Sequence, residues 1–280
     1  MTAGRARGLD GAAVDTAPVR HAVSADGTPV AFERTGHGPA IVLVHGGFVD
    51  RRASVPVATE LARQFTVVLV DRRGHGESGP YRDDHAIERE FEDVAAVVAA
   101  LPRPVTLVGH SYGAWCALHG ALLSARSGVP VARLVLYEPP PLWDVRDPVI
   151  DRIRSTLAAG ATDEAVAILL RDVTGIPGPT VERLQGSPFW QLVSANARGF
   201  VPELEAGRRF AIDPEAVRTL STPTLLLVGT ESPPFLRPVT DRLASLLPDA
   251  RVREIEGQGH GAMSSVPAHF AALVAEFARS

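Results

Sequence analysis

The sequence predicts an α/β protein with a mostly parallel sheet and helices on both faces. Short runs rich in Val, Leu and Ile recur along the chain, and their continuous apolarity indicates strands that are buried on both faces. Segments with helical spacing of apolar residues lie between most of these runs, and such alternation is typical of a parallel sheet. The chain has 280 residues, of which 45% are hydrophobic, so it can form a buried core.

The first elements differ from the rest of the predicted sheet. Residues 1–17 contain no apolar run of the kind found in secretory signals, and we expect them to form a flexible leader. Next, residues 21–24 and 30–34 flank Asp26-Gly27, a common hairpin-turn sequence, which predicts two antiparallel strands. Six buried strands are then expected, at 40–44, 66–70, 105–108, 134–137, 224–228 and 252–255. The predicted sheet therefore has eight strands.

Helical patterns fill most of the intervals between these strands. In the clearest, Asp84 is a candidate cap for a helix whose apolar face carries Ile87, Phe91, Val94 and Val98. Residues 241–247 and 268–277 show similar spacing. Between 139 and 214 strand-like runs stop, and helical stretches near 150–157 and 164–170 are separated by Gly and Pro clusters. We therefore expect a core of residues 18–138 and 215–280, interrupted by a helical lid at 139–214.

Composition excludes several kinds of chemistry. All 28 basic residues are arginine, so lysine-dependent Schiff-base, pyridoxal-phosphate and P-loop functions are excluded. A net charge of −4 without a basic patch argues against a nucleic-acid partner, and no apolar run is long enough to cross a membrane. The single cysteine, Cys116, permits no internal disulfide and fits a cytoplasmic location. No two histidines have a close ligand spacing, so we expect neither a metal nor a cofactor.

One motif indicates nucleophilic catalysis. The strand expected at 105–108 runs into Gly109-His110-Ser111-Tyr112-Gly113 and then into a helix-forming segment. A Gly-x-Ser-x-Gly string between a strand and a helix is typical of a nucleophile elbow. The two glycines leave room for a sharp turn that exposes the Ser111 hydroxyl. The start of the helix would offer the Tyr112 N–H to a developing oxyanion.

With this elbow, the chain resembles the α/β-hydrolase superfamily, in its lid-bearing branch of small serine esterases, lactonases and haloperoxidase-like hydrolases. The resemblance extends from residue 20 to the end. It also rests on Val-His-Gly-Gly at 44–47, Asp-Arg-Arg-Gly-His-Gly-Glu-Ser at 71–78 and Gly-Gln-Gly-His at 257–260. It implies the α/β-hydrolase fold, an oxyanion-hole N–H from Gly47, an acyl pocket bordered by Phe48, and His260 as the general base.

The positions of the other histidines and of two tryptophans indicate their roles. We expect His110, in the elbow, to be structural and to border the substrate pocket. Trp143 and Trp190 of the lid either line that pocket or form the core of the lid itself. His119 lies about two helical turns beyond Ser111, which is too far to act in the site. We expect structural roles for His45 and His75 and surface positions for His21, His37, His85 and His269.

The acid of the triad departs from the family pattern. The resemblance implies an Asp three residues beyond the Gly that ends the strand after the lid, but that position is Ser232. Glu231 lies one residue earlier. Glu138 lies at the carboxyl end of the strand before the lid, a place that some relatives use. This position favours Glu138, with Glu231 as the alternative and a dyad without an effective acid as the third possibility.

These residues predict a cofactor-free serine hydrolase. It would cleave an ester, lactone or thioester of a small apolar substrate through an acyl-enzyme, and we expect a monomer or homodimer. Acyl transfer or cyclisation by the same triad would follow if a substrate hydroxyl replaced water. A ligand-binding protein with a poorly active hydrolase pocket is the other alternative, and it depends on the displaced acid.

Overall fold

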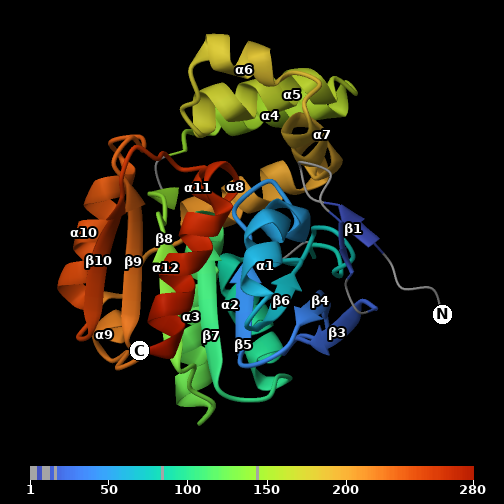
Figure 1. Cartoon of the computed structure of the whole chain (residues 1–280). Helices are drawn as coiled ribbons and strands as arrows, with labels where there is room; N and C mark the ends of the chain where they lie inside the picture. Colours follow the sequence, from blue (N-terminus) through green and yellow to red (C-terminus); the bar gives the residue numbers. More distant parts are fainter. Residues whose placement is uncertain (1–4, 8–12, 16–17, 83–84, 143–144) are drawn as a thin grey trace.

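A computed structural model describes residues 5–7, 13–15, 18–82, 85–142 and 145–280, and Figure 1 shows the arrangement. In this part of the chain an eight-stranded sheet has the strand order β10-β9-β8-β7-β5-β6-β4-β3. The strands from β5 to β10 pair in parallel, as predicted. The strands are β3 (Arg20–Val23), β4 (Pro29–Gly36), β5 (Ala40–Val44), β6 (Thr66–Val70), β7 (Val105–His110), β8 (Arg133–Tyr137), β9 (Thr224–Gly229) and β10 (Ala250–Ile255).

Side chains alternate between two apolar layers, one on each face of the sheet. On β5, Ile41 and Leu43 pack with α1 (Val55–Leu61) and α12 (Pro267–Arg279). Val42 and Val44 point to the other face, toward α2 (Ile87–Ala99), α3 (Tyr112–Arg126) and α10 (Leu236–Leu246). Because both faces are covered, β5 and β6 are buried at every position.

One strand does not fit the predicted burial. β10 is the edge strand beside β9, four consecutive residues of it are exposed, and Val252 is 38% exposed. The prediction that 252–255 is buried on both faces was therefore wrong. An edge strand has a neighbour on one side only, and the charged residues Arg253 and Glu254 keep this edge polar.

The predicted antiparallel hairpin is present. β3 pairs with β4 antiparallel, and β4 also pairs antiparallel with β6. In the turn, the Thr28 N–H donates to Oδ1 of Asp26 at 3.0 Å, and Gly27 has a φ of 84°. Within the expected leader, the structure describes two short strands, β1 (Arg5–Arg7) and β2 (Ala13–Asp15), which pair antiparallel.

The helix α2 has the predicted apolar face but a different start. Ile87, Phe91, Val94 and Val98 are all buried. The cap residue is Ala86, whose backbone is extended, and Asp84 lies outside the described residues. The patterns at 241–247 and 268–277 fall within α10 and α12.

A helical insertion lies between β8 and β9. It contains α4 (Asp147–Ala158), α5 (Thr162–Ile168), a π-helical turn (Leu169–Val173), α6 (Gly178–Leu184), α7 (Pro188–Ala195), a short 3-10 turn (Ala197–Gly199) and α8 (Phe200–Arg209). Figure 1 shows α4 to α7 stacked beyond one end of the sheet, the end at which β8 leads into the insertion. The insertion has an apolar cluster of its own, which includes Ile153, Leu169 and Phe200. The sequence had indicated only the helices near α4 and α5.

Short elements complete the chain. A 3-10 turn (Arg51–Ser54) precedes α1, α9 (Pro214–Arg218) precedes β9, and α11 (Ala262–Ser265) precedes α12. Among the described residues, the helices are too short or too polar to cross a membrane.

Candidate active site

Ser111 occupies a sharp turn between β7 and α3. Its φ of 54° and ψ of −126° are rare for a residue with a side chain. The Ser111 N–H donates to the Tyr137 carbonyl at 2.8 Å, which ties the turn to the end of β8. The flanking glycines are required for space. A Cβ on Gly109 would lie 2.4 Å from the Gly113 carbonyl oxygen, and one on Gly113 would lie 2.2 Å from that of His45.

Glu138 and His260 meet at the same edge of the sheet. Oε2 of Glu138 lies 2.6 Å from Nδ1 of His260, and the other oxygen, Oε1, accepts the Gly229 N–H at 2.7 Å. The Glu138 side chain is fully buried, whereas that of His260 is 33% exposed. Glu138 has a φ of 49°, so its backbone turns sharply as β8 ends. The carboxylate therefore has a fixed orientation toward the imidazole.

Two neighbouring side chains hold the loop of His260. The Tyr137 hydroxyl donates to the Gly259 carbonyl and accepts the Ala262 N–H at 3.3 Å, so it contacts the loop on both sides of His260. Nε2 of His110 donates to the His260 carbonyl at 3.1 Å. The His110 and His260 rings lie 4.6 Å apart between centroids. Burial, with a smaller contribution from His260, holds the pKa of His110 well below its usual range.

A second loop, residues 45–48 after β5, approaches Ser111. A Cβ on Gly46 would lie only 3.2 Å from Cβ of Ser111. Gly47, the expected oxyanion residue, is next in this loop. Tyr112 is the first residue of α3, so its N–H is one of those that have no acceptor within the helix. The structure thus brings Gly47 and Tyr112 to the neighbourhood of Ser111.

The other predicted residues lie in several places. Phe48 is half-buried and packs edge-to-face on Phe200 of the insertion, with centroids 5.6 Å apart. Trp190 is buried within the insertion, where its indole N–H donates to Asp163 at 2.7 Å, which favours the lid-core interpretation. Trp143 lies outside the described residues. Glu231 is exposed, and its N–H donates to the Gln258 carbonyl at 2.9 Å.

One histidine prediction was wrong. His85 is buried instead of lying on the surface. Its ring packs on Tyr81, with centroids 4.3 Å apart, and Nε2 lies 3.4 Å from Oε1 of Glu90. Arg209 of α8 donates to the His85 carbonyl at 3.1 Å. The insertion therefore covers this segment, which the local sequence did not indicate.

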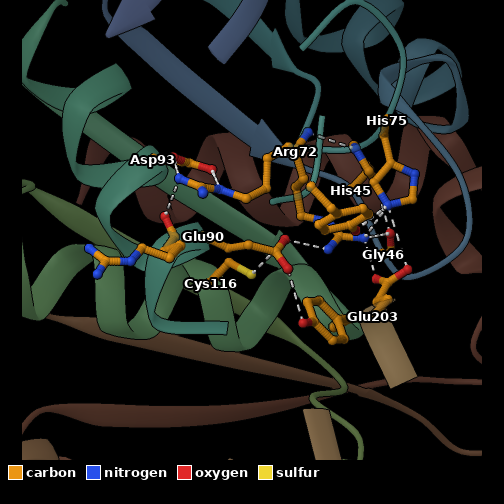
Figure 2. Close-up of polar contacts among 12 residues, drawn as sticks. His45, Gly46, Arg72, His75, Glu90, Asp93, Cys116 and Glu203 are labelled. Carbon is orange, nitrogen blue, oxygen red and sulfur yellow. Dashed lines mark hydrogen bonds and ion pairs between the residues drawn. The ribbon is translucent and has the colours of Figure 1, made fainter. Parts of the chain in front are cut away.

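A buried charged cluster next to the site was missed. Figure 2 shows Arg72, which follows β6, between Glu90 of α2 and Glu203 of α8. The side chains of all three are at most 1% exposed. One signal was available in the sequence: Glu90 and Glu203 fall on the apolar faces of their helices, three residues after Ile87 and Phe200. A carboxylate at such a position needs a buried partner.

The site brings together a carboxylate, an imidazole and a hydroxyl group. Within the described ranges, no group of three or more His, Cys, Asp or Glu could hold a metal ion. Cys116 of α3 is buried beside Glu90, with Sγ 3.9 Å from Oε2. Burial and the charge of Glu90 raise the pKa of this thiol well above its usual range, which makes Cys116 a poor nucleophile.

Comparison with known proteins identifies the family. The model of the alpha/beta hydrolase family matches residues 41–276, and the chain belongs to this family. An alpha/beta hydrolase from Sphaerobacter thermophilus is 35% identical, with a TM-score of 0.78 over 92% of this chain and 99% of that one. An esterase from Rhodococcus sp. ECU1013 is 25% identical, with a TM-score of 0.74 over 94% and 98% of the two chains.

A curated relative matches a smaller region. Over 90 residues the chain is 44% identical to the pimeloyl-[acyl-carrier protein] methyl ester esterase of Stenotrophomonas maltophilia. This match covers 32% of the chain and 33% of the relative, so the chain spans about a third of the length of that protein.

Proposed function

We propose that this protein is a serine hydrolase that cleaves carboxylic esters through an acyl-enzyme, without a cofactor. The observation that carries the proposal is the Glu138–His260 hydrogen bond beside the sharp turn that holds Ser111. A nucleophile, an imidazole and a buried carboxylate at one sheet edge are the parts of a catalytic triad. Membership of the alpha/beta hydrolase family and the likeness to esterases give independent support.

Each residue has a defined role in this reaction. Oγ of Ser111 attacks the ester carbonyl while Nε2 of His260 takes its proton, and the N–H groups of Gly47 and Tyr112 stabilise the oxyanion. His260 then gives the proton to the leaving alcohol. In the second half, His260 takes a proton from water, the hydroxide attacks the acyl-enzyme, and Ser111 recovers its proton as the acid is released. Glu138 holds Nδ1–H and stabilises the imidazolium.

We infer a small apolar acyl group in an ester, a lactone or a thioester. Phe48, next to Gly47, is half-buried and provides aromatic surface near the oxyanion loop, and the buried Phe200 packs against it. We also infer that the helical insertion at 139–214 acts as a lid, because α8 packs against this loop through Phe200. The likeness to a methyl ester esterase over a third of the chain supports ester chemistry as a class.

The alternative of a poorly active binding protein depended on the lack of an acid near His260. The Glu138–His260 hydrogen bond argues against this alternative and supports the proposed hydrolase. Acyl transfer and cyclisation would use the same catalytic side chains. They differ from hydrolysis in the molecule that accepts the acyl group, which is a hydroxyl of the substrate or of an alcohol instead of water.

Two measurements on the purified protein test the proposal. A series of p-nitrophenyl esters from acetate to decanoate should show turnover with a preference for one chain length, and adding an alcohol should divert only a minor part of the acyl group from water. A fluorophosphonate probe should label one site, which peptide mass spectrometry locates at Ser111. Absence of both turnover and labelling would contradict the proposal, and dominant transfer to the alcohol would replace hydrolysis by acyl transfer.

A further inference from the structure

The buried cluster of Arg72, Glu90 and Glu203 contacts both peptide groups next to Gly47. Nη2 of Arg72 donates to the Gly46 carbonyl at 3.0 Å, and Glu203 Oε2 accepts the Phe48 N–H at 2.9 Å. Arg72 itself pairs with Glu203 and, at 2.6 Å, with Glu90. Figure 2 shows this chain of contacts running from Glu90 through Arg72 to Gly46 and Glu203.

The first of these contacts sets the direction of the Gly47 N–H. The Gly46 carbonyl and the Gly47 N–H belong to one planar trans peptide, so they point in opposite directions. Two donors hold this carbonyl: Nδ1 of His45 at 2.8 Å and Nη2 of Arg72 at 3.0 Å. Rotation of this peptide would break both hydrogen bonds in a buried site, which is costly. The Gly47 N–H is thereby held in one orientation.

The protonation of His45 fits this arrangement. Nε2 of His45 accepts the Arg72 N–H at 3.1 Å, so Nδ1 carries the proton of the neutral ring and donates to Gly46. Burial, together with the charge of Arg72, holds the pKa of His45 well below its usual range. The neutral ring with its proton on Nδ1 is therefore the stable form.

The same cluster also holds Tyr112, the second expected oxyanion donor. The guanidinium of Arg72 lies over the Tyr112 ring, 4.5 Å from its centroid. The Tyr112 hydroxyl donates to Oε1 of Glu90 at 3.0 Å. One buried cation therefore contacts the segments that carry both N–H groups.

Charge balance gives Arg72 a second effect. A Cβ on Gly47 would lie 3.2 Å from Oε1 of Glu203, so this carboxylate lies close to the oxyanion loop. An unpaired negative charge there would oppose the negative charge that develops on the substrate. Burial disfavours the charged form of Arg72, but Glu203 and Glu90 outweigh it and raise the pKa of Arg72 well above its usual range. Arg72 is therefore charged, and it offsets part of the negative charge of the two carboxylates.

From these contacts, and on the basis of the function proposed above, we propose that Arg72 and Glu203 are positioning residues for the oxyanion hole. Arg72 orients the Gly47 N–H through the Gly46 carbonyl, and Glu203 fixes the next peptide through the Phe48 N–H. Because Glu203 belongs to α8, the helical insertion takes part in building the oxyanion hole.

The test compares Glu203→Gln with a matched control, Asp93→Asn. Asp93 of α2 is also buried and pairs with a buried arginine, Arg73, at 2.6 Å, but Arg73 bonds to Asp26, Ser24 and the Arg89 carbonyl and not to the oxyanion loop. Both substitutions remove one charge from a buried ion pair and keep the side-chain shape, so both should lower the Tm. Three quantities are measured for each variant: kcat and KM for a p-nitrophenyl ester, and Ki for an aryl trifluoromethyl ketone. This inhibitor forms a hemiketal whose oxyanion occupies the hole.

We expect Glu203→Gln to lower kcat by about 10- to 100-fold, somewhat less than the loss of a whole oxyanion donor, because the loss of a fixed Phe48 peptide outweighs the removal of one negative charge near the hole. KM should change by less than about threefold, because the affected interaction forms only in the transition state. Ki for the ketone should rise in parallel with the fall in kcat. Asp93→Asn should leave kcat and Ki within about twofold of the wild type, as for a site remote from the reaction.

Other results would overturn the inference. The inference fails if folded Glu203→Gln has the kcat and Ki of the wild type. It also fails if Glu203→Gln and Asp93→Asn lose kcat equally, because the loss of kcat would then follow the loss of stability alone. If Glu203→Gln does not fold, Glu203→Asp replaces it, because it keeps the charge but shortens the side chain that accepts the Phe48 N–H, and unchanged kcat and Ki in that variant would also count against the inference. If the wild type neither hydrolyses esters nor reacts at Ser111, the proposed function fails and this inference with it. A reactive wild type with an unaffected Glu203→Gln overturns the inference alone.

Discussion

Glu138 joins the strand before the helical insertion to the loop that carries His260. One of its carboxylate oxygens lies 2.6 Å from Nδ1 of His260, and the other accepts the Gly229 N–H at the end of β9. Glu138 directly follows β8, and its backbone φ is 49°. Its carboxylate therefore joins the end of β8 to the end of β9 and to the loop after β10 that carries His260. The acid of the proposed triad thus comes from before the insertion.

Replacing Glu138 by Gln should lower kcat by roughly 10²–10⁴-fold, because the neutral amide cannot stabilise the imidazolium or fix its tautomer. Steady-state kinetics with a p-nitrophenyl ester measure this loss. The matched control is Glu231→Gln, which changes an exposed carboxylate near the same edge and should keep kcat within about twofold, as surface substitutions usually do. A larger loss in Glu231→Gln than in Glu138→Gln would reverse the assignment of the acid.

Gly113→Ala should destabilise the fold strongly. Its methyl group would lie 2.2 Å from the His45 carbonyl oxygen, a backbone atom that cannot move independently. Overpacking of this kind costs roughly 1–3 kcal/mol or more. Gly178→Ala is the control, because a Cβ there meets no atom within 4 Å, and its stability should stay within about 0.5 kcal/mol of the wild type. Urea unfolding of the two variants measures the difference, and equal stabilities would contradict the structure of the elbow.

His119 should make stability depend on pH. Burial lowers its pKa to about 4, whereas the unfolded chain binds the proton near pH 6.5. Between these pH values the unfolded state therefore binds more protons than the folded state. The free energy of unfolding falls as the pH drops from 6.5 to 4, by up to about 3 kcal/mol. Urea unfolding of the wild type and His119→Gln at several pH values isolates this residue. Their difference in stability should shrink as the pH falls, and a constant difference would refute the assignment.

Cys116 should not react with thiol reagents in the folded protein. It is completely buried, and burial raises the pKa of its thiol. A disulfide-exchange reagent should modify it only after denaturation, at the rate of an ordinary thiol. Stoichiometric modification of the native protein at neutral pH would show that α3 is more open than the structure indicates.

Much of the fold could be predicted because it depends on local patterns. β5 and β6 have the predicted bounds, since each is a run of five buried residues rich in Val and Leu that ends at a polar residue, His45 or Asp71. Glu138 could be identified as a candidate because the carboxyl ends of neighbouring parallel strands meet at one edge. A carboxylate at the end of a neighbouring strand therefore lies near the elbow, whatever the conformation of the insertion.

Other features depend on contacts between distant segments. Burial of His85 and the pairing of Glu203 with Arg72 both follow from the position of α8, which no local pattern indicates. The exposure of β10 depends on its place at the edge of the sheet. α2 begins at Ile87 after Ala86, whose backbone is extended, and the cap candidate Asp84 lies outside the described residues.

The central claim is that Ser111 is the nucleophile, and the kcat of Ser111→Ala tests it most directly. Removing one oxygen leaves almost no cavity, so circular dichroism and Tm should match the wild type. We expect ester hydrolysis to fall by about 10⁴-fold or more, as for other serine triads. A folded Ser111→Ala protein that keeps more than about a tenth of the wild-type kcat would show that another group attacks the substrate.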